Sequence, residues 1–101
     1  MSKFEQSVQF LDATISLETE EVLRLTGLSP RELAELVDLG LLQDPEQGRF
    51  TGHVVRVGRR AAQLREVFEL DASGLALAVS LLARIEDLEA RLRELSLRLP
   101  R

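Results

Sequence analysis

The amino-acid sequence predicts an all-α fold, and three observations lead to that prediction. Leu, Ala, Glu and Arg dominate the 101 residues, and these side chains lose little rotamer freedom in a helix. Aromatic residues, which favour strands, are limited to four Phe. Apolar residues recur at helical spacing over much of the chain. At this length we expect one domain with one core.

The first part of the chain has the least distinct secondary-structure pattern. Residues 1–14 are poorly defined, and the β-branched, alternating stretch at 7–15 allows a short strand. Ser16 or Thr19 can then cap a helix over 17–26, because both side chains can accept a hydrogen bond from a free backbone N–H.

Residues 16–42 predict a helix-turn-helix. Gly27 follows the first helix, where a left-handed C-cap is favoured. The second helix has the strongest start signal in the chain and ends at Gly40. Its N-cap, first helical position and capping-box partner are Ser29, Pro30 and Glu32. Two helices joined by so short a turn are typical of this motif.

The second helix of this pair is predicted to be amphipathic. A helical wheel places three apolar residues inward, namely Leu33, Leu36 and Val37. The same wheel directs three carboxylates outward, those of Glu32, Glu35 and Asp38. Such a face is either a binding surface for a basic partner or an ordinary solvated face.

A loop or small wing is expected at 43–52, where Asp44-Pro45 and two glycines fall together. A third helix follows over 53–69. Its expected buried stripe is Val54, Val57, Ala61, Leu64 and Phe68. Gly58 interrupts this helix at a cost of about 1 kcal/mol relative to Ala, so we expect a close helix contact there.

A long final helix is predicted over 72–99, with Asp71 as its cap. Residues 75–83 are apolar nearly all round, and we expect them to be buried on more than one side. A heptad pattern follows, formed by Ala78, Leu81, Ile85, Leu88, Leu92, Leu95 and Leu99. The expected self-association residues are Leu81, Ile85, Leu88, Leu92 and Leu95. The alternative is that this seam packs against the chain's own core.

The net charge of −4 conceals an asymmetry. Residues 1–52 carry ten acidic against four basic side chains, whereas residues 53–101 carry seven against nine. The acidic half therefore favours a basic partner and disfavours nucleic acid. The third helix contains four arginines, Arg56, Arg59, Arg60 and Arg65. These either meet phosphates or pair with nearby acids such as Glu66 and Glu69.

Several function classes are disfavoured. The chain has no cysteine, and its single histidine, His53, cannot form a metal site alone. No phosphate-binding glycine loop or nucleophile–base pair occurs, so we expect neither an enzyme nor a cofactor. No apolar run is long enough to span a bilayer and the start lacks a signal-peptide core, so we expect a cytoplasmic protein without membrane contact.

Two sets of segments resemble a known family. Residues 20–30 and 39–42 resemble the helix-turn-helix of MerR-type regulators. Residues 59–65 and 75–89, including Arg59-Arg60 and Gln63-Leu64-Arg65, resemble the chaperone-modulator branch called CbpM. The resemblance covers about 15–97, and it is a pattern of helices and apolar spacing rather than an invariant motif.

The resemblance implies a protein partner. CbpM-like proteins bind the J-domain of the CbpA co-chaperone, a DnaJ relative, and prevent its stimulation of the DnaK chaperone. Such J-domains present a basic helix, so the expected contact residues are acidic, namely Glu20, Glu21, Glu32, Glu35 and Asp38. The alternatives are a MerR-type DNA-binding regulator and a bare dimerisation module. The DNA-binding pattern has aromatic and basic residues in the second helix, whereas this chain has Glu32-Leu33-Ala34-Glu35-Leu36-Val37 there.

Overall fold

The computed structural model describes residues 16–42 and 49–99. Within these ranges the chain forms four helices and one two-stranded sheet, which confirms the all-α prediction. The elements, in chain order, are β1 (Ser16–Glu18), α2 (Thr19–Thr26), α3 (Pro30–Asp38), β2 (Arg49–Thr51), α4 (Gly52–Phe68) and α5 (Ala72–Arg98). The strand predicted within 7–15 lies outside the described residues.

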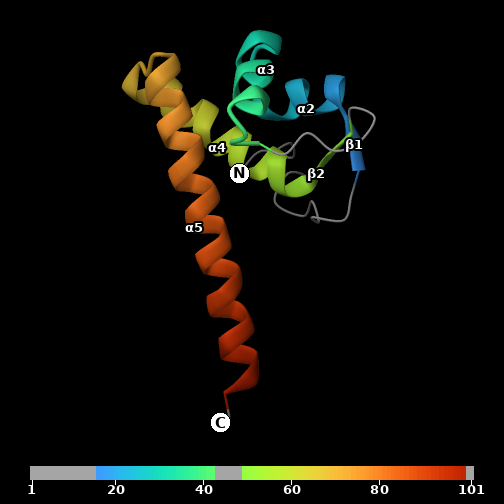
Figure 1. The fold of residues 1–101 in the computed structure, drawn as a ribbon, viewed down its shortest axis with the longest axis vertical. Coiled ribbons are helices and arrows are strands. Elements are labelled where there is room, and N and C mark those ends of the chain that lie inside the picture. The colour runs from blue at the N-terminus through green and yellow to red at the C-terminus, as the bar shows by residue number, and fades with distance from the viewer. Residues whose placement is uncertain (1–15, 43–48, 100–101) are drawn as a thin grey trace.

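The small sheet joins the strand that leads into α2 to the strand that leads into α4 (Figure 1). β1 and β2 are antiparallel, and their central pair, Leu17 and Phe50, is buried. Burial of this pair favours an extended backbone at 16–18, so the prediction of a helix from residue 17 was wrong. The N-cap of α2 is Glu18, which makes no side-chain capping bond, and Thr19 is the first helical residue.

The turn chemistry of the helix pair is confirmed. Gly27 ends α2 with φ +81°, a left-handed conformation that glycine adopts without steric cost. Ser29 caps α3: its hydroxyl accepts from the Glu32 N–H at 3.1 Å, and its own N–H donates to the Glu32 carboxylate at 2.9 Å. Leu33 and Leu36 are buried in the core. These local bonds fix the angle at which α3 leaves α2.

α4 lies at the centre of the fold and packs against both α2 and α5. A methyl group added at Gly58 would lie 3.0 Å from Thr26 Cγ2 and 3.2 Å from Leu28 Cδ1, which confirms the expected close contact. Val54, Val57 and Ala61 of the predicted stripe are buried, but Leu64 is half-buried. Phe68 is 66% exposed, because α4 ends there and no described element covers it.

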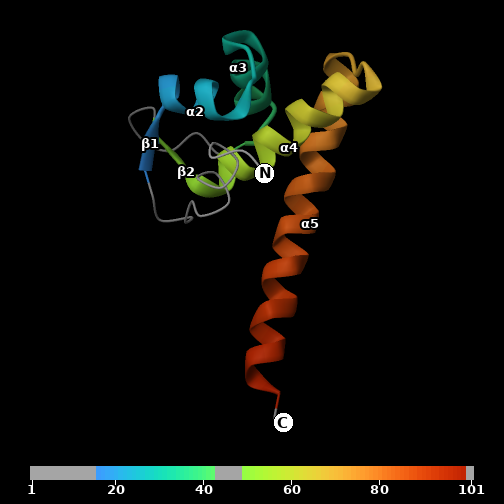
Figure 2. The same cartoon turned by 180° about the vertical axis from the view of Figure 1, so that it is seen from behind.

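α5 begins beside α4 and then extends well past the rest of the molecule (Figures 1 and 2). Asp71 caps it by accepting from the Gly74 N–H at 2.8 Å, as predicted. Leu75, Val79 and Leu82 form its buried face. The expectation that residues 75–83 are buried on more than one side was wrong. Only one side packs on α4, and the opposite side leaves Leu77 59% exposed.

Candidate protein-binding surface

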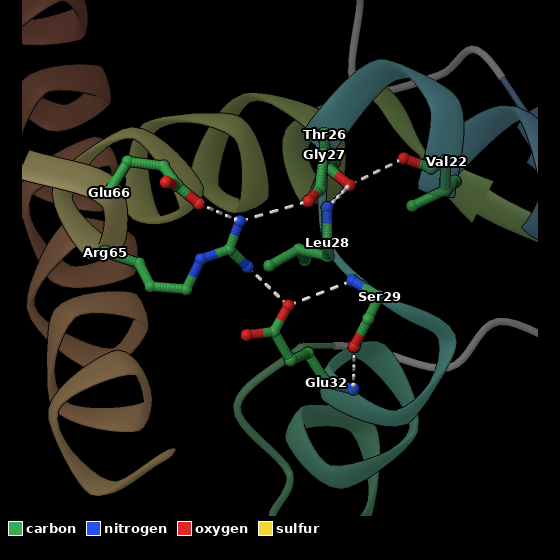
Figure 3. A network of polar contacts seen from close by, with 8 residues as sticks. All are labelled: Val22, Thr26, Gly27, Leu28, Ser29, Glu32, Arg65 and Glu66. Atoms are coloured by element: carbon green, nitrogen blue, oxygen red, sulfur yellow. Dashed lines mark hydrogen bonds and ion pairs between the residues drawn. The ribbon is translucent and has the colours of Figure 1, made fainter. Parts of the chain in front are cut away.

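A polar network ties the helix-turn-helix to α4 (Figure 3). The Arg65 guanidinium on α4 donates to the Glu32 carboxylate, to the Gly27 carbonyl at 3.2 Å and to Glu66 at 3.1 Å. The Glu32 carboxylate also accepts from the Ser29 N–H. One arginine therefore connects the turn, the first turn of α3 and α4.

The electrostatics of this network favour the charged forms of both partners. Burial alone would raise the pKa of Glu32, but hydrogen bonds from Ser29 and the neighbouring Arg65 outweigh it and lower the pKa. Burial alone would lower the pKa of Arg65, but the Glu32 and Glu66 carboxylates raise it. Glu32 and Arg65 thus stabilise each other in the folded protein.

The expected outward direction of Glu32 is therefore wrong. Glu32 and Leu36 are four residues apart, so they lie roughly 40° apart around the helix, and Glu32 borders the buried face. Its side chain is only 26% exposed and meets Arg65. A helical wheel represents α3 alone, so it does not show that α4 places the Arg65 guanidinium beside Glu32.

The other two acids of α3 are exposed, as predicted. The Glu35 carboxylate lies 3.2 Å from the guanidinium of Arg31, and both side chains are open to solvent. Asp38 lies near the C-terminal end of the helix. On α2, Glu20 is exposed and Glu21 is half-buried. The structure thus leaves carboxylates accessible on both helices of the helix-turn-helix.

The four arginines of α4 are engaged with protein groups. Arg56 donates to Glu86 of α5 at 2.7 Å, Arg60 lies 3.9 Å from Glu89, and Arg59 donates to the Leu25 carbonyl at 3.4 Å. Pairing with acids is thus the correct interpretation for Arg56, Arg60 and Arg65, and α5 supplies two of the four acids. The contacts of Arg56 and Arg60 hold α5 against α4, and together these interactions reduce the charge available to a phosphate.

His53 belongs to the same contact region. Its Nδ1 lies 3.7 Å from Glu86, and the side chain is partly exposed. Residues 16–42 and 49–99 contain no group of three or more His, Cys, Asp or Glu side chains that could hold a metal ion. Over the same ranges, no helix is both long and apolar enough to cross a membrane.

A groove of about 240 Å³ separates α3 from the turn between α4 and α5. Its lining combines apolar and charged side chains: Arg31, Glu32, Glu35, Leu36, Leu39, Leu70, Asp71, Ala72 and Leu75. Leu39 is 63% exposed. The sequence alone does not predict this groove, because its two walls are more than thirty residues apart in the chain.

The predicted heptad residues of α5 form an exposed apolar stripe. Their exposed fractions are 54% for Leu81, 42% for Ile85, 43% for Leu88, 63% for Leu92 and 56% for Leu95. Around the helix this stripe lies roughly 130° from the face that packs on α4. The alternative interpretation was that this stripe packs against the chain's own core. Among the described residues it does not.

Comparison with known proteins identifies the family. The family described as "MerR HTH family regulatory protein" matches residues 17–97. A chaperone modulatory protein CbpM from Salmonella arizonae is 35% identical over 92 residues, which cover 87% of this chain and 91% of that protein. The chain belongs to the CbpM family.

A CbpM protein from Escherichia coli O1:K1 / APEC is 34% identical over 94 residues, which cover 89% of this chain and 93% of that protein. No solved structure gives a significant match. The resemblance inferred from the sequence is therefore confirmed over nearly the whole chain. By name, these relatives are regulatory and modulatory proteins rather than enzymes.

Proposed function

We propose that this CbpM-family protein acts in the cytoplasm as a chaperone modulator that binds the J-domain of a CbpA/DnaJ-type co-chaperone. Binding covers the surface that DnaK needs and so prevents stimulation of its ATPase. One structural observation carries most weight. The exposed face of α3 presents Glu35 and Asp38, whereas a DNA-reading helix presents cationic or amide side chains in this position. Carboxylates there suit a basic protein helix.

The proposed contact surface consists of the accessible acids of both helices. Glu35 and Asp38 contribute from α3, and Glu20 and Glu21 contribute from α2. For Glu32 we propose a supporting role, because its carboxylate already binds Arg65 and Ser29. It holds the surface in place while the exposed acids meet the partner. Charges at such an interface mainly raise the rate of encounter and select against wrong partners.

The same features disfavour a DNA-binding regulator. The basic residues of α4 contact acids and a carbonyl of their own chain. A duplex would have to displace these contacts while facing the carboxylates of α3. We therefore propose a protein partner and no specific nucleic acid.

Self-association through α5 is part of the proposal. The stripe from Leu81 to Leu95 exposes large apolar side chains at heptad spacing, and monomeric proteins rarely leave such a continuous surface in water. The chain's own core does not cover it. A second copy, contributing the same stripe, would bury both, and the C-terminal part of α5, where most of the stripe lies, extends away from α3 (Figure 1).

The proposed contact is tested by reversing charge on α3 without disturbing the network at Glu32. The double change Glu35→Lys and Asp38→Lys affects exposed side chains, so the fold should be retained. J-domain binding, measured by calorimetry, should be lost, and J-stimulated DnaK ATPase activity should return. The matched control is Asp87→Lys with Glu94→Lys, two exposed acids on α5 that alter net charge equally.

The control variant should bind as wild type does. If the folded α3 variant binds the J-domain as tightly as the control, the contact lies elsewhere on the protein. If wild type itself does not bind a J-domain, the proposed function is wrong.

A further inference from the structure

We infer that the groove between α3 and the α4–α5 turn receives one apolar side chain from the partner's basic helix, with a neighbouring Lys or Arg resting on its acidic rim. This inference rests on the proposed function and specifies where the partner sits. It adds an apolar anchor to a contact that the exposed charges alone would leave purely electrostatic.

The groove has an apolar floor and one apolar wall. Leu36 of α3 and Leu75 of α5 are buried beneath it, with 2% and 3% of their surface exposed. Leu39 forms the open wall and is 63% exposed. Leu39 follows the last helical residue of α3, and the groove's opposite wall begins at Leu70. A volume of about 240 Å³ accommodates a single large side chain rather than a whole helix.

The rim of the groove is predominantly acidic. Three carboxylates line it, from Glu32, Glu35 and Asp71, against one guanidinium, that of Arg31. Glu32 is bound to Arg65, and Asp71 caps α5. Glu35 is paired with Arg31 in an exposed contact, which contributes little to stability. A cation from the partner can therefore take the place of Arg31 at small cost.

Both walls of the groove are fixed before any partner arrives. The bonds among Ser29, Glu32 and Arg65 hold the first turn of α3 against α4. The Asp71 cap and the buried Leu75 hold the start of α5. A preformed site loses little conformational entropy on binding, so even a small apolar contact can contribute strongly to affinity.

This combination selects the chemistry of the occupant. An apolar floor favours an aliphatic or aromatic side chain, because transfer from water into the groove is favourable. The acidic rim favours a cation beside it and repels phosphate groups of nucleic acids or anionic lipids. On a helix, positions three or four residues apart lie on one face, so a basic helix with one apolar residue fits both features.

The decisive variant is Leu39→Ala, which removes the apolar wall without changing charge. Leu39 is exposed, so this change should leave the melting temperature nearly unchanged. J-domain affinity measured by calorimetry should fall about tenfold, with the salt dependence of binding unaltered. The matched control is Val67→Ala, which truncates a 72% exposed apolar residue of α4 outside the groove. This control should bind as wild type does.

Two further variants test the groove from opposite directions. Ala72→Phe places a ring over the groove at an exposed position and should weaken binding at least as much as Leu39→Ala. Arg31→Ala leaves Glu35 without its exposed cation and should strengthen binding of a basic partner several-fold.

If wild type binds the J-domain but Leu39→Ala and Ala72→Phe bind equally well, the groove is not the anchor, while the proposed function stands. If wild type does not bind, the proposed function and this inference both fall.

Discussion

Replacement of Glu32 should destabilise the protein, whereas replacement of the exposed acid Glu35 on the same helix should not. Glu32→Gln retains an oxygen that can accept from Ser29 but removes the charge that faces Arg65. Glu32→Lys in addition places a second cation beside a guanidinium whose side chain is 19% exposed. Glu35→Lys is the matched control, because it reverses an exposed charge on the same helix.

The expected magnitudes follow from these contacts. Hydrogen bonds to charged groups contribute about 1.5–3 kcal/mol and neutral ones about 0.5–1.5 kcal/mol, so Glu32→Gln should lower the free energy of unfolding by about 1 kcal/mol. Glu32→Lys also loses the capping-box bond and adds repulsion, for a total of about 2–4 kcal/mol. Glu35→Lys should stay within about 0.5 kcal/mol of wild type.

Thermal unfolding followed by circular dichroism measures these differences at a fixed protein concentration. For a domain of this size, 1 kcal/mol corresponds to a shift of about 4–8 °C in melting temperature. The effect also depends on pH. Because folding lowers the pKa of Glu32, its contribution is present above the ordinary glutamate pKa and is lost as pH falls through the lowered value. Wild type and Glu32→Gln should therefore converge in acid. Equal melting of Glu32→Lys and Glu35→Lys at neutral pH would refute this reasoning.

Three further predictions concern the dimer, the core and nucleic acid. Leu88→Glu places a charge in the α5 seam, at a cost of several kcal/mol if a second copy buries it. Sedimentation should therefore show a wild-type dimer that the variant does not form. A wild type that stays monomeric at high concentration would show that the seam does not mediate self-association. Gly58→Ala gains about 1 kcal/mol of helix propensity, but the new methyl group meets Thr26 Cγ2. Two hydrogen bonds of the Thr26 hydroxyl hold this side chain in place. Denaturant unfolding should therefore show a free energy of unfolding about 1 kcal/mol below that of wild type. In a Thr26→Ser background, the same alanine should be neutral or stabilising, and an unchanged loss there would rule out this contact as the cause. A gel-shift assay at physiological salt should show negligible duplex binding, and tight binding that weakens steeply with salt would mean that a basic surface was overlooked.

Features determined by neighbouring residues were predictable from the sequence. The capping box at Ser29, the left-handed Gly27 and the Asp71 cap each depend on a few adjacent positions, and all three are present. The helix limits were likewise close, because apolar periodicity and caps mark them. The start of α2 differs because Leu17 pairs with Phe50, a partner more than thirty residues away.

Features that depend on tertiary packing were not predictable. The wheel showed which side of α3 is polar, but not that Arg65 would meet Glu32 there. Apolar residues at Phe68 and Leu77 fitted a buried pattern, yet no described element covers them. The groove beside α3 has no sequence signature, since Leu39 and Leu75 are brought together only by the fold. The proposed partner rests on the family resemblance, and the structure supplies a candidate surface for it.

The measurement that tests the central claim most directly is calorimetric titration of the wild-type protein with an isolated CbpA-type J-domain over a range of salt concentrations. We expect saturable binding, with an affinity that falls as salt rises because acidic side chains meet a basic helix. In parallel, the bound J-domain should no longer stimulate DnaK ATPase activity. Absence of binding at low salt, or binding that leaves ATPase stimulation intact, would contradict the proposed function.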